Sequence, residues 1–286
     1  MKNNFSIFKE NFHKTFTLIA RSVFLQERTW IFNIFIPVIL IFTVIFLFGR
    51  YNATYLVLPP QIMSLFLITS LFASLFMSII LIEMKYSQIL QRMKMVNIDA
   101  KNLMLGIVVN TIILSICNLI ISFLAVWMLC IVFKQEAFNN IWNLYYWNWI
   151  WNFTINIFLT ILSVSIFLFV IDLINKKNLS KVINIILFLS IILFSDIVIP
   201  SFVTSSSKVI TSLGYINVFK YISWLSLLIN SFAFIDYEGG IQQIVQGNLE
   251  NKMIFINSIY FCFILPIVLI PIFYYLDIKL FKWKGN

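Results

Sequence analysis

The chain has 286 residues, of which 61% are apolar and only 11% are charged, with a formal net charge of +9. Because soluble domains carry about 25% charged residues, this composition excludes a soluble protein and predicts an integral membrane protein. The glycines form no phosphate-binding loop, and a single histidine, His13, excludes metal sites built from several histidines. We therefore expect no metal or nucleotide cofactor on this chain, and no nucleic-acid partner.

Six apolar runs are long enough to cross a membrane. A helix needs about 20 apolar residues to span ~30 Å of hydrocarbon. The runs near this length occupy residues 31–48, 62–82, 103–133, 149–171, 182–199 and 253–276. We therefore expect an all-α integral membrane protein with six transmembrane helices, organised as one membrane domain over residues 1–286.

A seventh apolar stretch, residues 209–234, lies in the outer region between the fifth and sixth spans, residues 200–252. Its middle carries Gly214, Asn217 and Lys220. A lysine at the centre of a span costs about 2.5 to 3.5 kcal/mol on insertion. We expect this stretch to be a re-entrant or surface-lying helix, and a seventh span is the less favoured alternative.

Basic residues are concentrated on one side of the predicted spans. Of the 20 Lys and Arg residues, fifteen fall in the N-terminal arm, the second-to-third connection, the fourth-to-fifth connection and the C-terminal tail. The positive-inside rule places these segments in the cytoplasm. The sequence therefore predicts a multi-pass protein of the cell membrane with both termini cytoplasmic, which agrees with an even number of spans.

The N-terminal arm, residues 1–30, has the pattern of an amphipathic helix. Apolar side chains recur at steps of three and four residues, which places them on one helical face; they are Phe5, Phe8, Phe12, Phe16, Ile19 and Val23. Such a helix lies flat on a membrane surface, where anionic lipids attract its basic residues. We expect an elbow helix that contacts lipid on the cytoplasmic leaflet.

The second-to-third connection, residues 83–101, is too patterned for a flexible loop. Ile89, Met93 and Val96 recur at helical spacing, with basic residues between them, which predicts a short amphipathic helix. Asn97 and Asp99 then mark a break and the N-cap of the next helix. Two interpretations are open: a positively charged anchor without a partner, or a docking helix that transmits force from a cytosolic protein.

The stretch that starts in this connection resembles the loop signature of ABC-2-type transporter permeases, approximately L-K-R-L-R-A-T-P-V-S-x-x-x-L-L-L-G. The direct matches to that signature are Leu90, Arg92, Leu103, Leu105 and Gly106. Asn97 stands where the family usually has proline, and Gln88 stands where it often has glycine. The elbow helix and the six spans are also similar to the architecture of that family.

The resemblance implies a permease subunit of an ATP-driven exporter, which is itself not an enzyme. Such a subunit pairs with a second permease subunit, identical or different, and is coupled to cytosolic ATPase subunits that bind ATP and Mg²⁺. Met93, Val96 and Ile98 would then supply apolar anchoring on the ATPase, and basic side chains would pair with acidic groups. The implied coupling residues are Glu83, Lys85, Ile89, Arg92, Met93, Lys94, Val96, Asn97, Ile98 and Asp99.

Few charges lie within the predicted spans, whereas ion-coupled carriers hold charged groups near the membrane midplane. Glu83 and Asp172 lie at the predicted cytoplasmic ends. Asp196, close to Pro200 at the outer end of the fifth span, is expected to be solvated at the interface or, alternatively, to line a transport pathway.

The third span carries polar side chains on one face, which favours helix–helix packing over a substrate pathway; they are Thr111, Ser115, Asn118 and Ser122. A weakly polar, aromatic-rich pathway suits an amphipathic cargo such as a lipid, a drug or a hydrophobic peptide. The alternative function is a self-contained secondary transporter or channel. A membrane-embedded enzyme is disfavoured because the sequence holds no catalytic motif.

Overall fold

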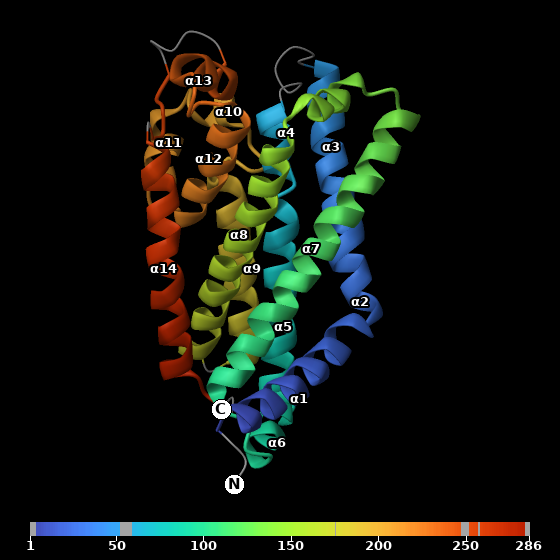
Figure 1. The fold of residues 1–286 in the computed structure, drawn as a ribbon, viewed down its shortest axis with the longest axis vertical. Helices are drawn as coiled ribbons and strands as arrows, with labels where there is room; N and C mark the ends of the chain where they lie inside the picture. The colour runs from blue at the N-terminus through green and yellow to red at the C-terminus, as the bar shows by residue number, and fades with distance from the viewer. Residues whose placement is uncertain (1–3, 52–58, 175, 247–251, 257, 284–286) are drawn as a thin grey trace.

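A computed structural model describes residues 4–51, 59–174, 176–246, 252–256 and 258–283 of the chain (Figure 1). Within these ranges the protein is helical and contains no strand. Six helices are long and apolar enough to cross a membrane: Glu27–Leu47, Pro59–Tyr86, Ala100–Val132, Tyr146–Leu173, Lys177–Phe194 and Ile259–Leu280. The all-α fold and the six apolar helices are therefore as the sequence predicts.

The elements of these six helices differ in detail from the predicted runs. The first combines α2 (Glu27–Trp30), the π-helical turn η1 (Ile31–Phe35) and α3 (Ile36–Tyr51), and the second combines α4 (Pro59–Leu65) and α5 (Ile68–Tyr86). The others are α7 (Ala100–Val132), α8 (Tyr146–Leu173), α9 (Lys177–Phe194) and α14 (Ile259–Leu280).

The fifth and sixth helices show the largest shifts from their predicted bounds of 182–199 and 253–276. α9 begins at Lys177, because the polar residues after Lys176 continue the helix, and it ends at Phe194. The backbone leaves the helix there, and Asp196 has a φ of 57°, a left-handed value that a helix cannot contain. α14 starts only at Ile259.

Helix α5 lies at the centre of the bundle, where α7, α8 and α9 all pack against it (Figure 1). In the most apolar stretch of the Pro59–Tyr86 span 89% of the residues are buried, compared with 11% in that of α14 at the periphery. Small hydroxyl side chains allow this close packing. Ser163 of α8 donates a hydrogen bond of 2.6 Å to Ser74 of α5. Asn184 of α9 donates one of 3.3 Å to Ser78 of α5.

The N-terminal arm forms α1 (Asn4–Phe24), which crosses the lower part of α7 in Figure 1. Ile19 and Val23 are buried, so this part of the apolar stripe packs on the bundle rather than on lipid. The approach is close because Gly106 of α7 has no side chain: a Cβ there would lie 3.2 Å from Thr15 Cγ2. The side chains of Phe5 and Phe8 lie outside the described part.

One end of the bundle contains the start of α1, the end of α14 and the short helix α6 (Ile89–Met95) (Figure 1). The opposite end contains the 3₁₀ turn η2 (Glu136–Asn143) and four helices of the region between α9 and α14. These are α10 (Ser201–Thr204), α11 (Lys208–Gly214), α12 (Val218–Asn230) and α13 (Tyr237–Val245).

The stretch 209–234 is a bent helix pair, since α11 and α12 meet at an angle of 104°. Every residue of α12 from Phe219 to Asn230 is buried, mainly against α4, α8 and α14. A helix that lay on the surface would expose one face, so the surface-lying alternative is wrong for α12. A re-entrant segment or a broken span fits the geometry.

The packing of α13 on the end of α12 leaves no space at Gly240. A Cβ at this position would lie 2.5 Å from Ala233 Cα, which belongs to the backbone and cannot move aside. We expect Gly240→Ala to lower the free energy of unfolding by about 1–3 kcal/mol. The exposed Glu238→Ala in the same helix is the control, with a change below about 0.5 kcal/mol. Detergent unfolding followed by circular dichroism measures both, and equal midpoints would contradict the packing argument.

Candidate functional site

The segment 87–99 is the part of the predicted coupling connection 83–101 that protrudes from the end of the bundle with the start of α1, and it is called the coupling segment after that prediction (Figure 1). It comprises α6 with its flanking turns. Arg92 and Lys94 are exposed, and Met95 and Val96 have 79% and 62% of their surfaces exposed. The segment therefore presents basic and apolar side chains together.

The opposite face of the coupling segment is attached to the bundle. Leu90, Met93 and Ile98 have exposed fractions of 0%, 3% and 7%. They belong to the apolar core around the C-terminal half of α5. The prediction that Met93 and Ile98 anchor a partner is therefore wrong, because this chain already covers them. The exposed apolar side chains are those of Ile89, Met95 and Val96.

Lys85 and Glu83, also predicted to face a partner, form ion pairs within the chain. Lys85 is 2% exposed; its Nζ donates to Asp172 Oδ1 at 2.9 Å and to the Ile171 carbonyl at 3.2 Å. It cannot contact a partner directly. Glu83 is half-buried and pairs with Lys181 of α9 at 2.6 Å. Both pairs connect α5 to neighbouring helices rather than to a second protein.

Two residues with left-handed backbone conformations flank α6 and reverse the direction of the chain there. Gln88 precedes α6 with φ of 64°, and Asn97 follows it with φ of 58°. Asp99 is the N-cap residue of α7, as predicted, although its side chain makes no capping hydrogen bond. Asn11 of α1 donates to the Asn97 carbonyl at 3.4 Å, so α1 touches the turn. The predicted break and helix start are both present.

The four polar residues predicted to share one face of the third span are buried between the helices, which fits helix packing rather than a substrate pathway. Their exposed fractions are 0% for Thr111 and Ser122 and 1% for Ser115 and Asn118. Ser115 donates to Asn156 of α8 at 2.8 Å and accepts from Thr160 at 3.0 Å. Asn118 Nδ2 and Ser122 Oγ have no hydrogen-bond partner in the described ranges. None of the four lines either cavity described below.

Asp196 is not solvated at an interface, because it is 2% exposed. Its Oδ2 lies 3.1 Å from Lys220 Nζ of α12 and accepts from Trp224 Nε1 at 2.7 Å. Lys220 Nζ also lies 4.8 Å from the centre of the Phe255 ring. Gly214 leaves the room that the lysine needs, since a Cβ there would be 2.7 Å from Nζ. Each charge thus compensates the burial of the other.

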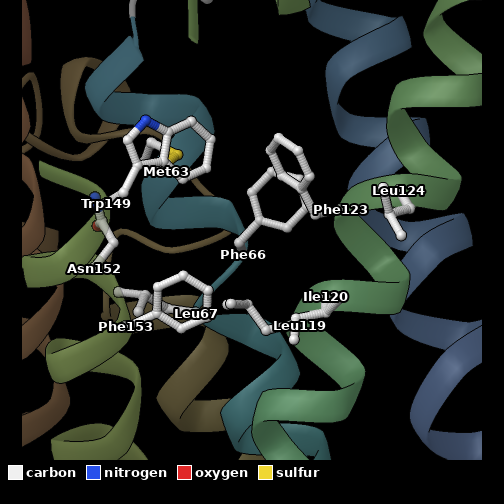
Figure 2. A pocket seen from close by; sticks show the side chains of 10 residues that line it. All are labelled: Met63, Phe66, Leu67, Leu119, Ile120, Phe123, Leu124, Trp149, Asn152 and Phe153. Atoms are coloured by element: carbon white, nitrogen blue, oxygen red, sulfur yellow. The ribbon is translucent and has the colours of Figure 1, made fainter. Parts of the chain in front are cut away.

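Several cavities lie between the helices of the described ranges, and two of them have the most apolar linings. One of about 210 Å³ opens between the α4–α5 pair, α7 and α8, where Phe66 and Phe123 face each other with ring centres 5.4 Å apart (Figure 2). A second of about 440 Å³ lies between α8, α12 and α14 and includes Trp151 and Phe263. Asn152 borders the first cavity, but its amide group is bonded to Asn230 and Ser226.

The described part of the chain contains no group of three or more His, Cys, Asp or Glu side chains that could hold a metal ion. In comparisons with known proteins, no family model, curated protein or solved structure matches this chain.

The Asp196–Lys220 pair generates a prediction about stability. Lys220→Met leaves a buried carboxylate unpaired, so we expect a loss of about 3–5 kcal/mol in the free energy of unfolding. The double variant Asp196→Asn/Lys220→Met removes both charges and is expected to regain most of this loss. Unfolding in detergent measures the cycle. The control is Lys14→Met, since Lys14 forms an exposed pair with Glu10; that change should be below about 1 kcal/mol. A double variant as unstable as the single one would contradict the pairing.

The left-handed turn before α6 generates a second prediction. Glycine has no Cβ to oppose a positive φ, so Gln88→Gly is expected to stabilise the protein by about 1 kcal/mol. Gln91→Gly, in the middle of α6 with an ordinary helical backbone, should instead destabilise it by about the same amount. Thermal unfolding of the two variants measures the difference, and a loss of stability in both would show that residue 88 is not left-handed.

Proposed function

We propose that this chain is the membrane-spanning permease subunit of an ATP-driven exporter of the ABC-2 type. The observation that carries the proposal is the coupling segment. Its outer face presents Arg92, Lys94, Met95 and Val96, whereas Leu90 and Met93 attach its inner face to the bundle. A partner bound to the exposed face would push on a short helix that is fixed to the spans.

Force on the coupling segment has a direct route into the membrane helices. α6 packs on α5, and Asp99 directly precedes α7, so both spans move with the segment. The buried Lys85–Asp172 pair at 2.9 Å connects the same end of α5 to α8. Because packed helices shift as rigid bodies, movement of α6 would change the spacing of α5, α7 and α8.

The backbone of the coupling segment supports the resemblance to the permease signature. Gln88 occupies the position where that family often has glycine, and its φ is 64°. Left-handed backbone positions favour glycine, so the backbone seen at Gln88 is one that the family's glycine would also adopt. At Asn97 the backbone departs from the signature, because its φ of 58° is one that the family's usual proline, with φ fixed near −65°, cannot adopt.

Under this proposal the coupling end is cytoplasmic, both termini lie inside, and the protein is in the cell membrane. ATP and Mg²⁺ bind to separate ATPase subunits, and a second permease subunit completes the pathway. The cargo is amphipathic, a lipid, drug or hydrophobic peptide, because two cavities between the helices are lined almost entirely by apolar side chains. Such linings would bind acyl or aromatic groups and exclude small ions.

The proposal predicts the protein that co-purifies with this chain. We expect the tagged protein, extracted in mild detergent from the cells that encode it, to carry an ATPase with a phosphate-binding loop, detected by mass spectrometry. The double charge reversal Arg92→Glu/Lys94→Glu should reduce that ATPase at least tenfold, because both side chains are exposed on the coupling segment.

The matched control is Lys176→Glu/Lys177→Glu, which reverses two exposed charges at the start of α9, at the same end of the bundle. This variant should retain the ATPase. An equal loss in both variants would indicate a general charge effect, and absence of any ATPase from the folded wild type would contradict the permease proposal.

One observation favours the alternative, a self-contained secondary transporter or channel. Carriers of that class hold charged groups inside the membrane domain, and the exposed fractions of Asp172, Asp196 and Asp277 are 3%, 2% and 1%. Two of these carboxylates are paired with lysines. If no ATPase co-purifies, this alternative replaces the exporter.

A further inference from the structure

Asp277, near the end of α14, is the buried carboxyl group that the described contacts leave without compensation. Its exposed fraction is 1%, and neither carboxylate oxygen has a hydrogen-bond partner among the described residues. Asp172 of α8 is its charged neighbour. The oxygen of Asp172 that does not contact Lys85, Oδ2, is also unpartnered.

Among the described residues, no positively charged group donates a hydrogen bond to the Asp277 carboxyl group. Lys85 and Asp172, with Nζ and Oδ1 2.9 Å apart, already form a neutral pair. The Lys282 backbone N–H lies 3.5 Å from Asp172 Oδ1, and Tyr274 lies one turn before Asp277 on α14. Asp172 faces two lysines, since the Lys282 side chain adds positive charge near it, but Asp277 accepts a hydrogen bond from neither. An ionised Asp277 would therefore be a second buried carboxylate without a contacting cation, and burial of an uncompensated ion costs several kcal/mol.

We propose that Asp277 is a proton-binding site, in which the carboxyl group holds one proton between α14 and α8 while the neighbouring Lys85–Asp172 pair stays ionised. With the proton bound, the group is neutral and its burial requires no counter-ion. The proton comes from the aqueous phase at this end of the bundle and returns there when released, so no other reactant is needed.

A proton fits this site better than a metal ion. Lys85 already supplies the positive charge beside Asp172, and it would repel a second cation. The described residues also offer no third acidic, His or Cys ligand. Exchange of this proton with water also depends on helix packing. Because Asp277 is 1% exposed and α14 packs on α8, the exchange requires α14 to separate from α8.

This inference goes beyond the proposed function and does not rest on it, since ATP-driven export requires no proton site. The site therefore links proton binding to the position of α14 whether or not an ATPase binds the coupling segment.

Infrared spectroscopy of the purified protein in an ester-free detergent tests the proposal at pH 7. The wild type should show the carbonyl stretch of a protonated carboxylic acid, and Asp277→Asn should lose it. The exposed Asp99→Asn is the control and should keep the band. A wild type without the band, or an Asp277→Asn variant that retains it, would overturn the proposal.

Thermal unfolding supplies a second readout. An amide replaces a neutral acid closely, so Asp277→Asn should leave the midpoint unchanged, whereas Lys85→Met should lower it by about 5 °C or more because Asp172 loses its buried partner. An equal fall in both variants would show that Asp277 is ionised and paired. If replacing Na⁺ by choline lowers the midpoint of the wild type but not of Asp277→Asn, the site binds a metal cation instead.

Discussion

The structure depends on one constraint of a lipid environment: a polar group inside the bundle must find its partner within the protein, because hydrocarbon offers none. Helix α5 shows the result most clearly. Ser74 and Ser78 meet side chains from α8 and α9 at hydrogen-bond distance, and Lys85 meets Asp172. These contacts fix the position of α5, and α6, the segment proposed to bind a partner, continues directly from its end.

The two buried ion pairs of the described ranges lie at opposite ends of the bundle and have comparable roles. Lys85–Asp172 connects α5 to α8 near the coupling segment, and Asp196–Lys220 connects the end of α9 to the bent pair α11–α12. Judged from the sequence alone, Lys220 makes a full membrane span costly. Its ion pair with Asp196 compensates the burial of that charge. The bundle is thereby connected at both ends through specific charges, and between these ends hydrogen bonds of Ser, Thr and Asn side chains join the helices among the apolar residues.

Periodicity and hydropathy predicted the six apolar helices, the short helix before α7 and the turn at Asn97, because all of these depend on neighbouring residues. They could not show which face of a helix the rest of the chain covers. Met93 and Val96 belong to one predicted apolar stripe, yet Met93 is 3% exposed and Val96 is 62% exposed. The partner of Asp196 is 24 residues away, and that of Lys85 is 87 residues away. No local pattern contains such pairings.

The packing of α1 on α7 has a consequence for biosynthesis. Asn110 of α7 donates to the Phe16 carbonyl, and these residues are 94 positions apart in the chain. A ribosome makes the N-terminal region first, so α1 lacks its main docking surface until the first turns of α7, the third apolar helix, have been synthesised. The hydrogen bond from Asn11 to the Asn97 carbonyl links the docked arm to the coupling segment.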